Sequence, residues 1–160
     1  PHESWMSYKS LSTGDESSDK KIALLHSKVQ DQMKEFILKA KYRFGINLRV
    51  VEGYRTYKEQ DALYAKGRSV PGQKVTNARG GQSNHNFGLA IDVVPIENGK
   101  INWETNKYPI IGRIGKSVGL EWGGEWKTIV DRPHFQNIFG YSLSELRTLP
   151  KDKAGLPIIK

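Results

Sequence analysis

The sequence predicts an α+β fold in which a small antiparallel sheet is flanked by helices. One observation is the spacing of apolar residues at three and four positions near the N-terminus, which is the helical period. Short apolar runs in the middle of the chain have the length of strands. Two of these runs flank Asn98-Gly99, a strong hairpin turn that pairs strands antiparallel. A length of 160 residues suits one domain with a buried core.

The N-terminal part of the chain is expected to hold an arm, a helix and a strand. Residues 1–18 are polar and predict an irregular arm. Apolar side chains recur every three or four positions over residues 19–44, which predicts one long helix. Gly45 follows it and is suited to a left-handed cap. Apolar and polar residues then alternate over 46–50, the pattern of a half-buried strand.

The middle of the chain predicts a helix, a long loop and a hairpin. Thr56-Tyr57-Lys58-Glu59 is a capping box, and we expect a helix from it to Lys66. Residues 68–88 are rich in Gly, Asn and Ser, and a loop of this length in a compact domain is usually functional or disordered. Residues 89–96 indicate a buried strand, and residues 100–103 indicate its return strand.

Four shorter elements are expected after the hairpin. Apolar spacing predicts a helix over residues 110–118, and short strands are expected at 120–122 and 134–138. A second capping box, Ser142-Leu143-Ser144-Glu145, predicts a short helix near the C-terminus.

We expect three segments along the chain: the arm at 1–18, one catalytic domain at 19–140, and a short helix with a tail or linker at 141–160. Residues 150–160 have the appearance of the loose tail. Because the chain begins at Pro1 rather than Met, we expect a processed or excised piece whose leader or anchor would have been lost.

The composition narrows the class of partner. Lys and Arg number 25 against 17 Asp and Glu, a formal charge of +8. This charge favours an anionic partner, although an effect on solubility alone explains it equally well. Dense basic runs with interleaved aromatics are lacking, so no nucleic-acid partner is predicted. No apolar run is long enough to cross a membrane. The sequence gives no indication of oligomeric state.

Two short stretches carry the residues for metal chemistry. His85 and Asp92 lie seven positions apart, and Asp131 and His134 lie three apart. The chain has no Cys, so a metal would need His and carboxylate ligands. Two histidines with one carboxylate leave a coordination position open, as catalytic zinc requires. Asp92 interrupts an apolar strand and needs a partner there. The residues alone also allow an ordinary histidine or a buried ion pair at these positions.

Asp131 and Arg55 are the candidates for catalytic work beside such a metal. Asp131 is near His134 in sequence and could take a proton from attacking water and pass it to a leaving amine. An aspartate that only starts a turn is the alternative. Arg55 stands at a strand-to-helix junction, where a guanidinium can hold a carboxylate or a developing oxyanion. An ordinary surface arginine is its alternative.

The motifs around these residues resemble one family, the VanY-like D-alanyl-D-alanine carboxypeptidase and L-alanyl-D-glutamate endopeptidase group of zinc peptidases. That group includes phage endolysin domains and bacterial wall hydrolases. Several motifs agree in order over about residues 45–138, which is far more specific than one pattern. The matching motifs are Gly53-Tyr54-Arg55-Thr56, Glu59-Gln60, Leu63-Tyr64-Ala65, Gly67-Arg68, Gly80-Gly81-Gln82-Ser83-Asn84-His85, Gly88-Leu89-Ala90-Ile91-Asp92, Trp122-Gly123-Gly124 with Trp126, and Asp131 to Phe135.

The resemblance implies a role for each position. His85, Asp92 and His134 match the zinc ligands of the family. Asp131 matches the catalytic acid/base, which is Glu in many relatives and Asp in the endolysin-like branch. The family fold, which is related to that of hedgehog signalling proteins, is a small antiparallel sheet flanked by helices.

Three further positions match residues that contact the substrate peptide in relatives: Arg55, Gln60 and Ser83. The implied substrate is the stem peptide of peptidoglycan, whose carboxylates suit Arg55 and a basic surface. The implied place of action is the cell wall, reached by export if the source is bacterial or by host lysis if it is a phage.

The resemblance leaves the bond to be cleaved open. Residues 78–85 favour an L-alanyl-D-glutamate endopeptidase, and a D,D- or L,D-carboxypeptidase on the same substrate is the second interpretation. A non-catalytic, zinc-stabilised wall-binding module is the third. Asp131 and Arg55 are both retained, which favours catalysis over that module.

Overall fold

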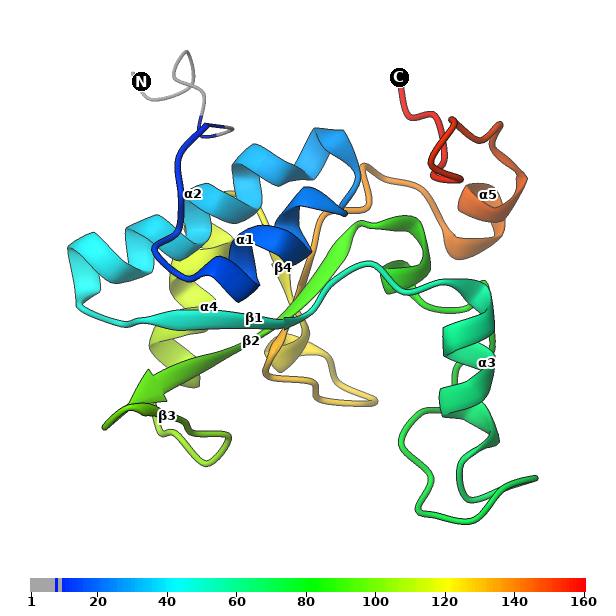
Figure 1. The fold of residues 1–160 in the computed structure, drawn as a ribbon, viewed down its shortest axis with the longest axis horizontal. Helices are drawn as coiled ribbons and strands as arrows, with labels where there is room; N and C mark the ends of the chain where they lie inside the picture. The colour runs from blue at the N-terminus through cyan, green and yellow to red at the C-terminus, as the bar shows by residue number, and fades with distance from the viewer. Residues whose placement is uncertain (1–7, 9) are drawn as a thin grey trace.

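A small antiparallel sheet forms the centre of the computed structural model, which describes residues 8 and 10–160 (Figure 1). Four strands are hydrogen-bonded in the order β1-β2-β5-β4, and β3 pairs with β2 outside this path. All the strand pairs are antiparallel, so the expected α+β class is confirmed. The strands are β1 Leu48–Glu52, β2 Ala90–Glu97, β3 Lys100–Ile101, β4 Glu121–Trp122 and β5 His134–Gln136.

Helices surround this sheet. Figure 1 shows α1 and α2 along one side of β1, and α3 at the end of the sheet away from β3. Within the described residues, no helix combines the length and the apolar composition that a membrane crossing needs. The helices are α1 Glu16–Ala23, α2 Ser27–Phe44, α3 Tyr57–Ala65, α4 Tyr108–Ser117 and α5 Leu143–Thr148, with the short 3-10 helices η2 Asn84–Phe87 and η3 Gly123–Glu125.

The two faces of the sheet have different environments. Phe135 in β5 packs against Phe36 of α2, with 4.5 Å between ring centroids, so its side of the sheet faces the helices. Asp92 is paired with His134 in the β2–β5 register. Because successive residues of a strand point to opposite faces, Asp92 and His134 project from the face away from α2. The sheet therefore presents these two side chains together on its other face.

The single helix expected over residues 19–44 is wrong, because α1 and α2 are separate. His26 lies between them and caps α2, with Nδ1 accepting a hydrogen bond from the Lys28 N–H at 3.1 Å. The His26 N–H also donates to the Gly88 carbonyl, so the break is fixed by contact with a distant loop. Leu25 in this break is buried, so the apolar period continues across it and hides the interruption.

The N-terminal arm also differs from the expectation. Residues 1–7 and 9 lie outside the described residues. Helix α1 already begins at Glu16, because Asp15 accepts a hydrogen bond from the Ser18 N–H and caps it. Asp15 also pairs with Arg49 of β1 at 2.9 Å.

The C-terminal residues, expected as a loose tail or linker, pack onto the domain. Leu156 and Ile159 are buried. The His26 ring donates from Nε2 to the Pro157 carbonyl at 2.7 Å, since a carbonyl oxygen can only accept. The division of the chain at residues 19 and 140 stays a prediction.

The remaining local predictions are confirmed with shifted ends. Thr56 and Ser142 both form complete capping boxes at the starts of α3 and α5. Asn98 and Gly99 have φ of 54° and 78°, as a tight hairpin turn requires. Strand β1 begins two residues later than expected, and β3 is shorter than the predicted return strand.

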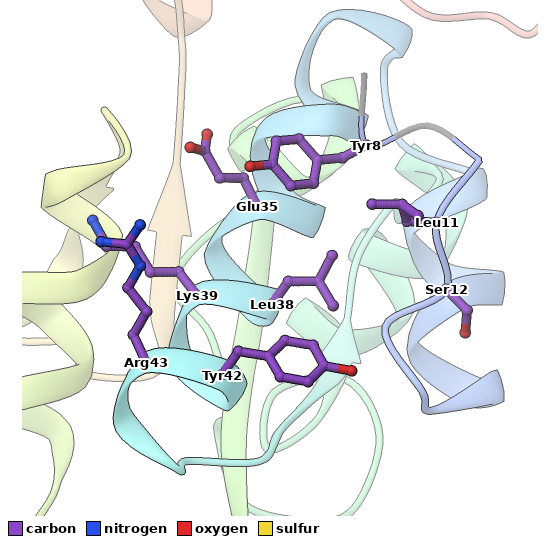
Figure 2. Close-up of a pocket in the computed structure, with 8 residues that line it drawn as sticks. All are labelled: Tyr8, Leu11, Ser12, Glu35, Leu38, Lys39, Tyr42 and Arg43. Carbon is purple, nitrogen blue, oxygen red and sulfur yellow. The ribbon is translucent and has the colours of Figure 1, made fainter. Parts of the chain in front are cut away.

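A hollow of about 340 Å³ lies on the helical side of the molecule. Figure 2 shows Tyr8 and Leu11 of the N-terminal segment near Leu38 and Tyr42 of α2. Charged side chains of α2 border the same hollow. None of the site residues expected from the sequence lines it.

Gly115 of α4 is a sensitive point of this packing, because a Cβ there would lie 2.4 Å from Cε2 of buried Phe135. Overpacking costs about 1–3 kcal/mol, and alanine in place of a helical glycine gains about 1 kcal/mol. We expect Gly115→Ala to lower the free energy of unfolding by up to about 2 kcal/mol in urea titrations. Arg113→Ala, at an exposed position of the same helix, should change it by under about 0.5 kcal/mol. A net stabilisation by Gly115→Ala would contradict this packing.

Candidate metal centre and active site

Three side chains converge on the open face of the sheet: His85, Asp92 and His134. Their ligand atoms all lie within 4.8 Å of one another. Asp92 Oδ1 is 3.4 Å from His85 Nε2 and 3.3 Å from His134 Nδ1. Asp92 and His134 meet through strand pairing, whereas His85 comes from η2, directly before β2. The structure thus brings together the three residues expected as metal ligands.

In each imidazole ring, the nitrogen that points away from Asp92 forms a hydrogen bond. That hydrogen bond indicates which ring nitrogen carries the proton. His85 Nδ1 is 2.9 Å from the Gly53 carbonyl oxygen, which can only accept, so Nδ1 is the donor. His134 Nε2 is 2.7 Å from the Gln136 side-chain carbonyl and donates to it in the same way. In the neutral imidazoles, the nitrogens that face Asp92 therefore carry lone pairs. Two imidazole nitrogens and a carboxylate oxygen, all acceptors, fit a bound cation.

The charges in this cluster support that fit. Burial opposes ionisation of Asp92, but the adjacent His134 and His85 outweigh it and hold the pKa of Asp92 well below its ordinary value. Burial alone would lower the pKa of His134, yet the Asp92 carboxylate raises it overall. Oδ1 of Asp92 is buried without a hydrogen-bond partner among the described residues. A proton and a metal cation would compete for this one position.

Local sequence explains how His85 reaches the centre. Ser83 caps η2, and its hydroxyl accepts a hydrogen bond from the His85 N–H at 3.2 Å. Gly88 ends η2 at a φ of 68°, and a Cβ there would lie 2.7 Å from the His26 nitrogen. Only glycine fits this turn from η2 into β2. Ser83, expected to contact substrate, also lines the cleft, so it has a structural role in addition to its expected one.

Arg55 lies at the edge of the same centre. It donates to the Gln60 side-chain carbonyl at 2.8 Å and forms an ion pair with Glu52. An arginine has five N–H donors, so further donors remain for a ligand. Gln60 is fully buried and donates to the Ala78 carbonyl at 2.9 Å. Gln60, expected to contact substrate, is therefore placed to hold Arg55 and does not line the cleft.

Asp131 lies beside the cluster on the loop before β5. Its Oδ2 is 3.8 Å from His134 Nδ1, and 43% of its side chain is exposed. Burial and then the Asp92 charge raise the pKa of the Asp131 carboxyl above its ordinary value. Its backbone N–H donates to the Gly123 carbonyl at 2.9 Å. Asp131 can thus reach the centre while remaining open to the cleft.

The Trp122-Gly123-Gly124 motif builds the support for this loop. Trp122 stacks on Phe135 at 6.4 Å between centroids, and its indole N–H donates to the Arg132 carbonyl at 2.7 Å. A Cβ on Gly123 would lie 2.4 Å from the Asp131 carbonyl oxygen, and one on Gly124 would lie 2.2 Å from the Trp122 ring. Both glycines are needed for this close approach.

The centre opens into a cleft of about 1210 Å³. Trp126 lines it and lies 5.0 Å from the His134 ring, between centroids. Lys74 and Lys127 line the cleft from two separate loops, and Ile129 adds an exposed apolar side chain. The cleft thus combines a candidate metal centre with cationic, acidic and apolar side chains, which suits an extended polar ligand.

Sequence reasoning missed the groups that orient the two histidines. The Gly53 carbonyl is a backbone group, and no residue type specifies its role. Gln136 follows His134 by two positions and so lies on the same face of β5, a relation the strand prediction already contained. Asn84 donates to Gln136 from η2, and this contact depends on the tertiary fold.

Comparisons with known proteins agree with this geometry. Residues 76–137 match a family described as D-alanyl-D-alanine carboxypeptidase. The chain is 42% identical over 104 residues to the peptidoglycan L-alanyl-D-glutamate endopeptidase CwlK of Bacillus subtilis (strain 168), covering 59% of this chain and 62% of that protein. It is 33% identical over 101 residues to the L-alanyl-D-glutamate peptidase of Listeria phage A118, covering 61% of this chain and 33% of that protein.

The chain thus spans 62% and 33% of the lengths of these two relatives, less than two thirds of either. Among solved structures, the L-Ala D-Glu endopeptidase ChiX of Serratia marcescens is similar, with a TM-score of 0.59 and 27% identity. That match covers 78% of this chain and 88% of ChiX. The segment that matches the D-alanyl-D-alanine carboxypeptidase family, residues 76–137, contains His85, Asp92, Asp131 and His134, and its motifs are among those that the sequence indicated.

Proposed function

We propose that this chain is a zinc-dependent peptidase that cleaves the stem peptides of peptidoglycan at the L-alanyl-D-glutamate bond. The observation that carries the proposal is the convergence of three lone-pair donors in an open cleft, with the Asp131 carboxylate beside them. A structural metal site is closed by protein ligands, whereas a three-ligand site keeps a position for reactants.

His85 Nε2, Asp92 Oδ1 and His134 Nδ1 are the groups that would hold the metal. Two imidazoles with one carboxylate are a common ligand set of catalytic zinc, and thiolates are excluded because the chain has no cysteine. Bound zinc supplies Lewis acidity that polarises a peptide carbonyl and makes water a better nucleophile.

Asp131 is the proton carrier in this proposal. Its carboxylate is near the metal centre but points into the cleft, where it can accept the proton of the attacking water. It can then return that proton to the nitrogen of the leaving amine, which completes hydrolysis of the bond. The support of Asp131 by Gly123 fixes its distance from His134.

Arg55 is the group proposed to bind a substrate carboxylate or the developing oxyanion. Gln60 and Glu52 hold its guanidinium at the edge of the cleft, so little rotational freedom is lost on binding. Ser83 lines the same cleft and is proposed to contact the peptide. Gln60 acts through Arg55.

The choice of substrate rests on charge and on the relatives. Stem peptides carry carboxylates, and Lys74 and Lys127 add positive charge to two loops around the cleft. Both CwlK and the phage relative are named for the L-alanyl-D-glutamate bond, as is ChiX. The proposed place of action is therefore the cell wall.

Purified sacculi test the bond directly. Digestion with the zinc-loaded protein should release fragments with a new N-terminal D-glutamate, detected by mass spectrometry after N-terminal labelling. Free D-alanine with intact L-alanyl-D-glutamate bonds would instead identify a carboxypeptidase and refute the proposed specificity.

Zinc should stabilise the protein, because it binds the folded site. At a free zinc concentration of 100 times its dissociation constant, we expect the free energy of unfolding to rise by about 2.7 kcal/mol over the chelator-treated protein. Asp92→Asn should lose this increment, since a neutral amide oxygen is a weaker ligand. Glu52→Gln is the matched control, because Glu52 lies in register with Asp92 but forms its ion pair with Arg55. Equal increments in wild type and Asp92→Asn would rule out Asp92 as a ligand.

Asp131→Asn separates proton transfer from metal binding. The amide has nearly the same shape but cannot accept the proton, so kcat should fall by about 100-fold or more. Zinc affinity should remain close to that of the wild type, because Asp131 is not a ligand in this proposal. Hydrolysis of a muropeptide at the wild-type rate by this variant would remove Asp131 from the mechanism.

A further inference from the structure

Gln136 connects the two segments that provide the histidines. Its side-chain carbonyl accepts from His134 Nε2 at 2.7 Å and from Asn84 Nδ2 at 3.1 Å. Asn84 is the neighbour of His85 in η2, and Gln136 lies two residues after His134 in β5. Gln136 is nearly inaccessible, with 5% of its surface exposed. One buried oxygen thus receives hydrogen bonds from both ligand-bearing elements.

The side-chain amides of Asn84 and Gln136 can bond to each other in two orientations. The two orientations place the proton of His134 on different ring nitrogens. In the arrangement observed, Gln136 accepts, so His134 carries its proton on Nε2 and presents a lone pair at Nδ1. If both amides were reversed, Gln136 would donate to His134 Nε2, and the proton would move to Nδ1. That proton would point toward Asp92 and occupy the position proposed for the metal.

The observed arrangement leaves one group without a partner. Oδ1 of Asn84 is buried and has no hydrogen bond among the described residues. Reversal of both amides would turn that oxygen toward Gln136, but it would place the Asn84 Nδ2 group in the same unpartnered position. Each arrangement thus leaves one polar group of Asn84 without a partner, and only the observed arrangement leaves a lone pair on His134 Nδ1.

We propose that Gln136 is a positioning residue of the metal centre, oriented by Asn84, whose side-chain carbonyl keeps His134 Nδ1 free for the metal. The inference rests on the proposed metal centre and adds the residue pair that presets it. The same hydrogen bonds link η2 to β5. A shift of the His85 segment would therefore move Asn84, then Gln136, and so change the hydrogen bond to His134.

Zinc affinity, measured by competition with a chromophoric chelator, tests this role without relying on activity. Gln136→Met keeps a similar volume but removes the acceptor, and zinc should bind about 10–100-fold more weakly. Gln136→Glu keeps an oxygen that accepts from both donors, so its affinity should equal or exceed that of the wild type. Gln82→Met is the matched control, because Gln82 lines the same cleft and its side chain accepts from the Arg79 backbone N–H, away from both histidines' hydrogen bonds. Its zinc affinity should be unchanged.

Asn84→Asp gives a test of sign. A carboxylate at this position can only accept, so it should turn the Gln136 amide and place a donor against His134. We expect weaker zinc binding, although the added negative charge alone would strengthen it. Tighter binding by Asn84→Asp would overturn the orienting role of Asn84.

The outcomes separate this inference from the metal centre itself. Wild-type affinity in Gln136→Met, or an equal loss in folded Gln136→Glu, would overturn the role of the carbonyl while leaving the centre intact. A wild-type protein that binds no zinc would overturn the centre and this inference together. If circular dichroism shows that Gln136→Met does not fold, the zinc affinities of Gln136→Glu and Asn84→Asp are compared with that of the wild type. Weaker binding by Asn84→Asp with unweakened binding by Gln136→Glu supports the inference, and any other result overturns it.

Discussion

Three hydrogen-bond acceptors that face one another across less than 5 Å are the constraint on which the rest of the site depends. Asp92 would be costly to bury in the apolar strand β2 without a compensating charge. The two imidazole nitrogens directed at it add lone pairs rather than protons, because their other nitrogens donate to Gly53 and Gln136. Such an arrangement is stable when a cation sits between the three groups. The surrounding residues therefore hold these three groups, the frame of the site, in position around one cation.

Alternate side chains of a strand point to opposite faces of the sheet, and the two faces of β5 have different roles. Phe135 points to α2 and α4 and fixes β5 against the hydrophobic core, while its neighbour His134 points to the cleft. A short strand therefore provides both rigidity and chemistry, as preorganised sites require. The loops add the residues proposed to contact substrate, and hydrogen bonds hold them: Gln60 bonds the Arg55 guanidinium, and Gly123 bonds the Asp131 backbone.

Much of the site could be predicted from the sequence, because its parts lie in short motifs with recognisable residue types. The histidines and Asp92 combine metal-ligand chemistry with glycine-rich turns, and Thr56 and Ser142 carry complete capping signals. The break between α1 and α2 could not be predicted in this way. His26 is an unusual cap, and its fixing contacts come from Gly88 and Pro157, which are far away in sequence.

The same reason explains the other differences. The C-terminal segment was expected to be a loose tail or linker, but Leu156 packs close to Gly88 in the turn after η2. Gln60 matches a substrate-contacting position of the family motif. In the structure it is buried and bonds Arg55, which follows from the packing of α3. The role of Gln136 is visible only in the tertiary structure, because its hydrogen bonds join β5 to η2. Local motifs identified the residues that perform chemistry, whereas tertiary contacts determine the residues that orient them.

X-ray absorption at the zinc edge tests the central claim most directly, because it reports the ligands of the bound ion itself. With one equivalent of zinc, we predict two imidazole nitrogens and at least one carboxylate oxygen at about 2.0–2.2 Å, with four ligands in total. His134→Ala should remove one imidazole from this shell. A zinc shell without imidazole, or one that is unchanged in His134→Ala, would contradict the assignment of this centre.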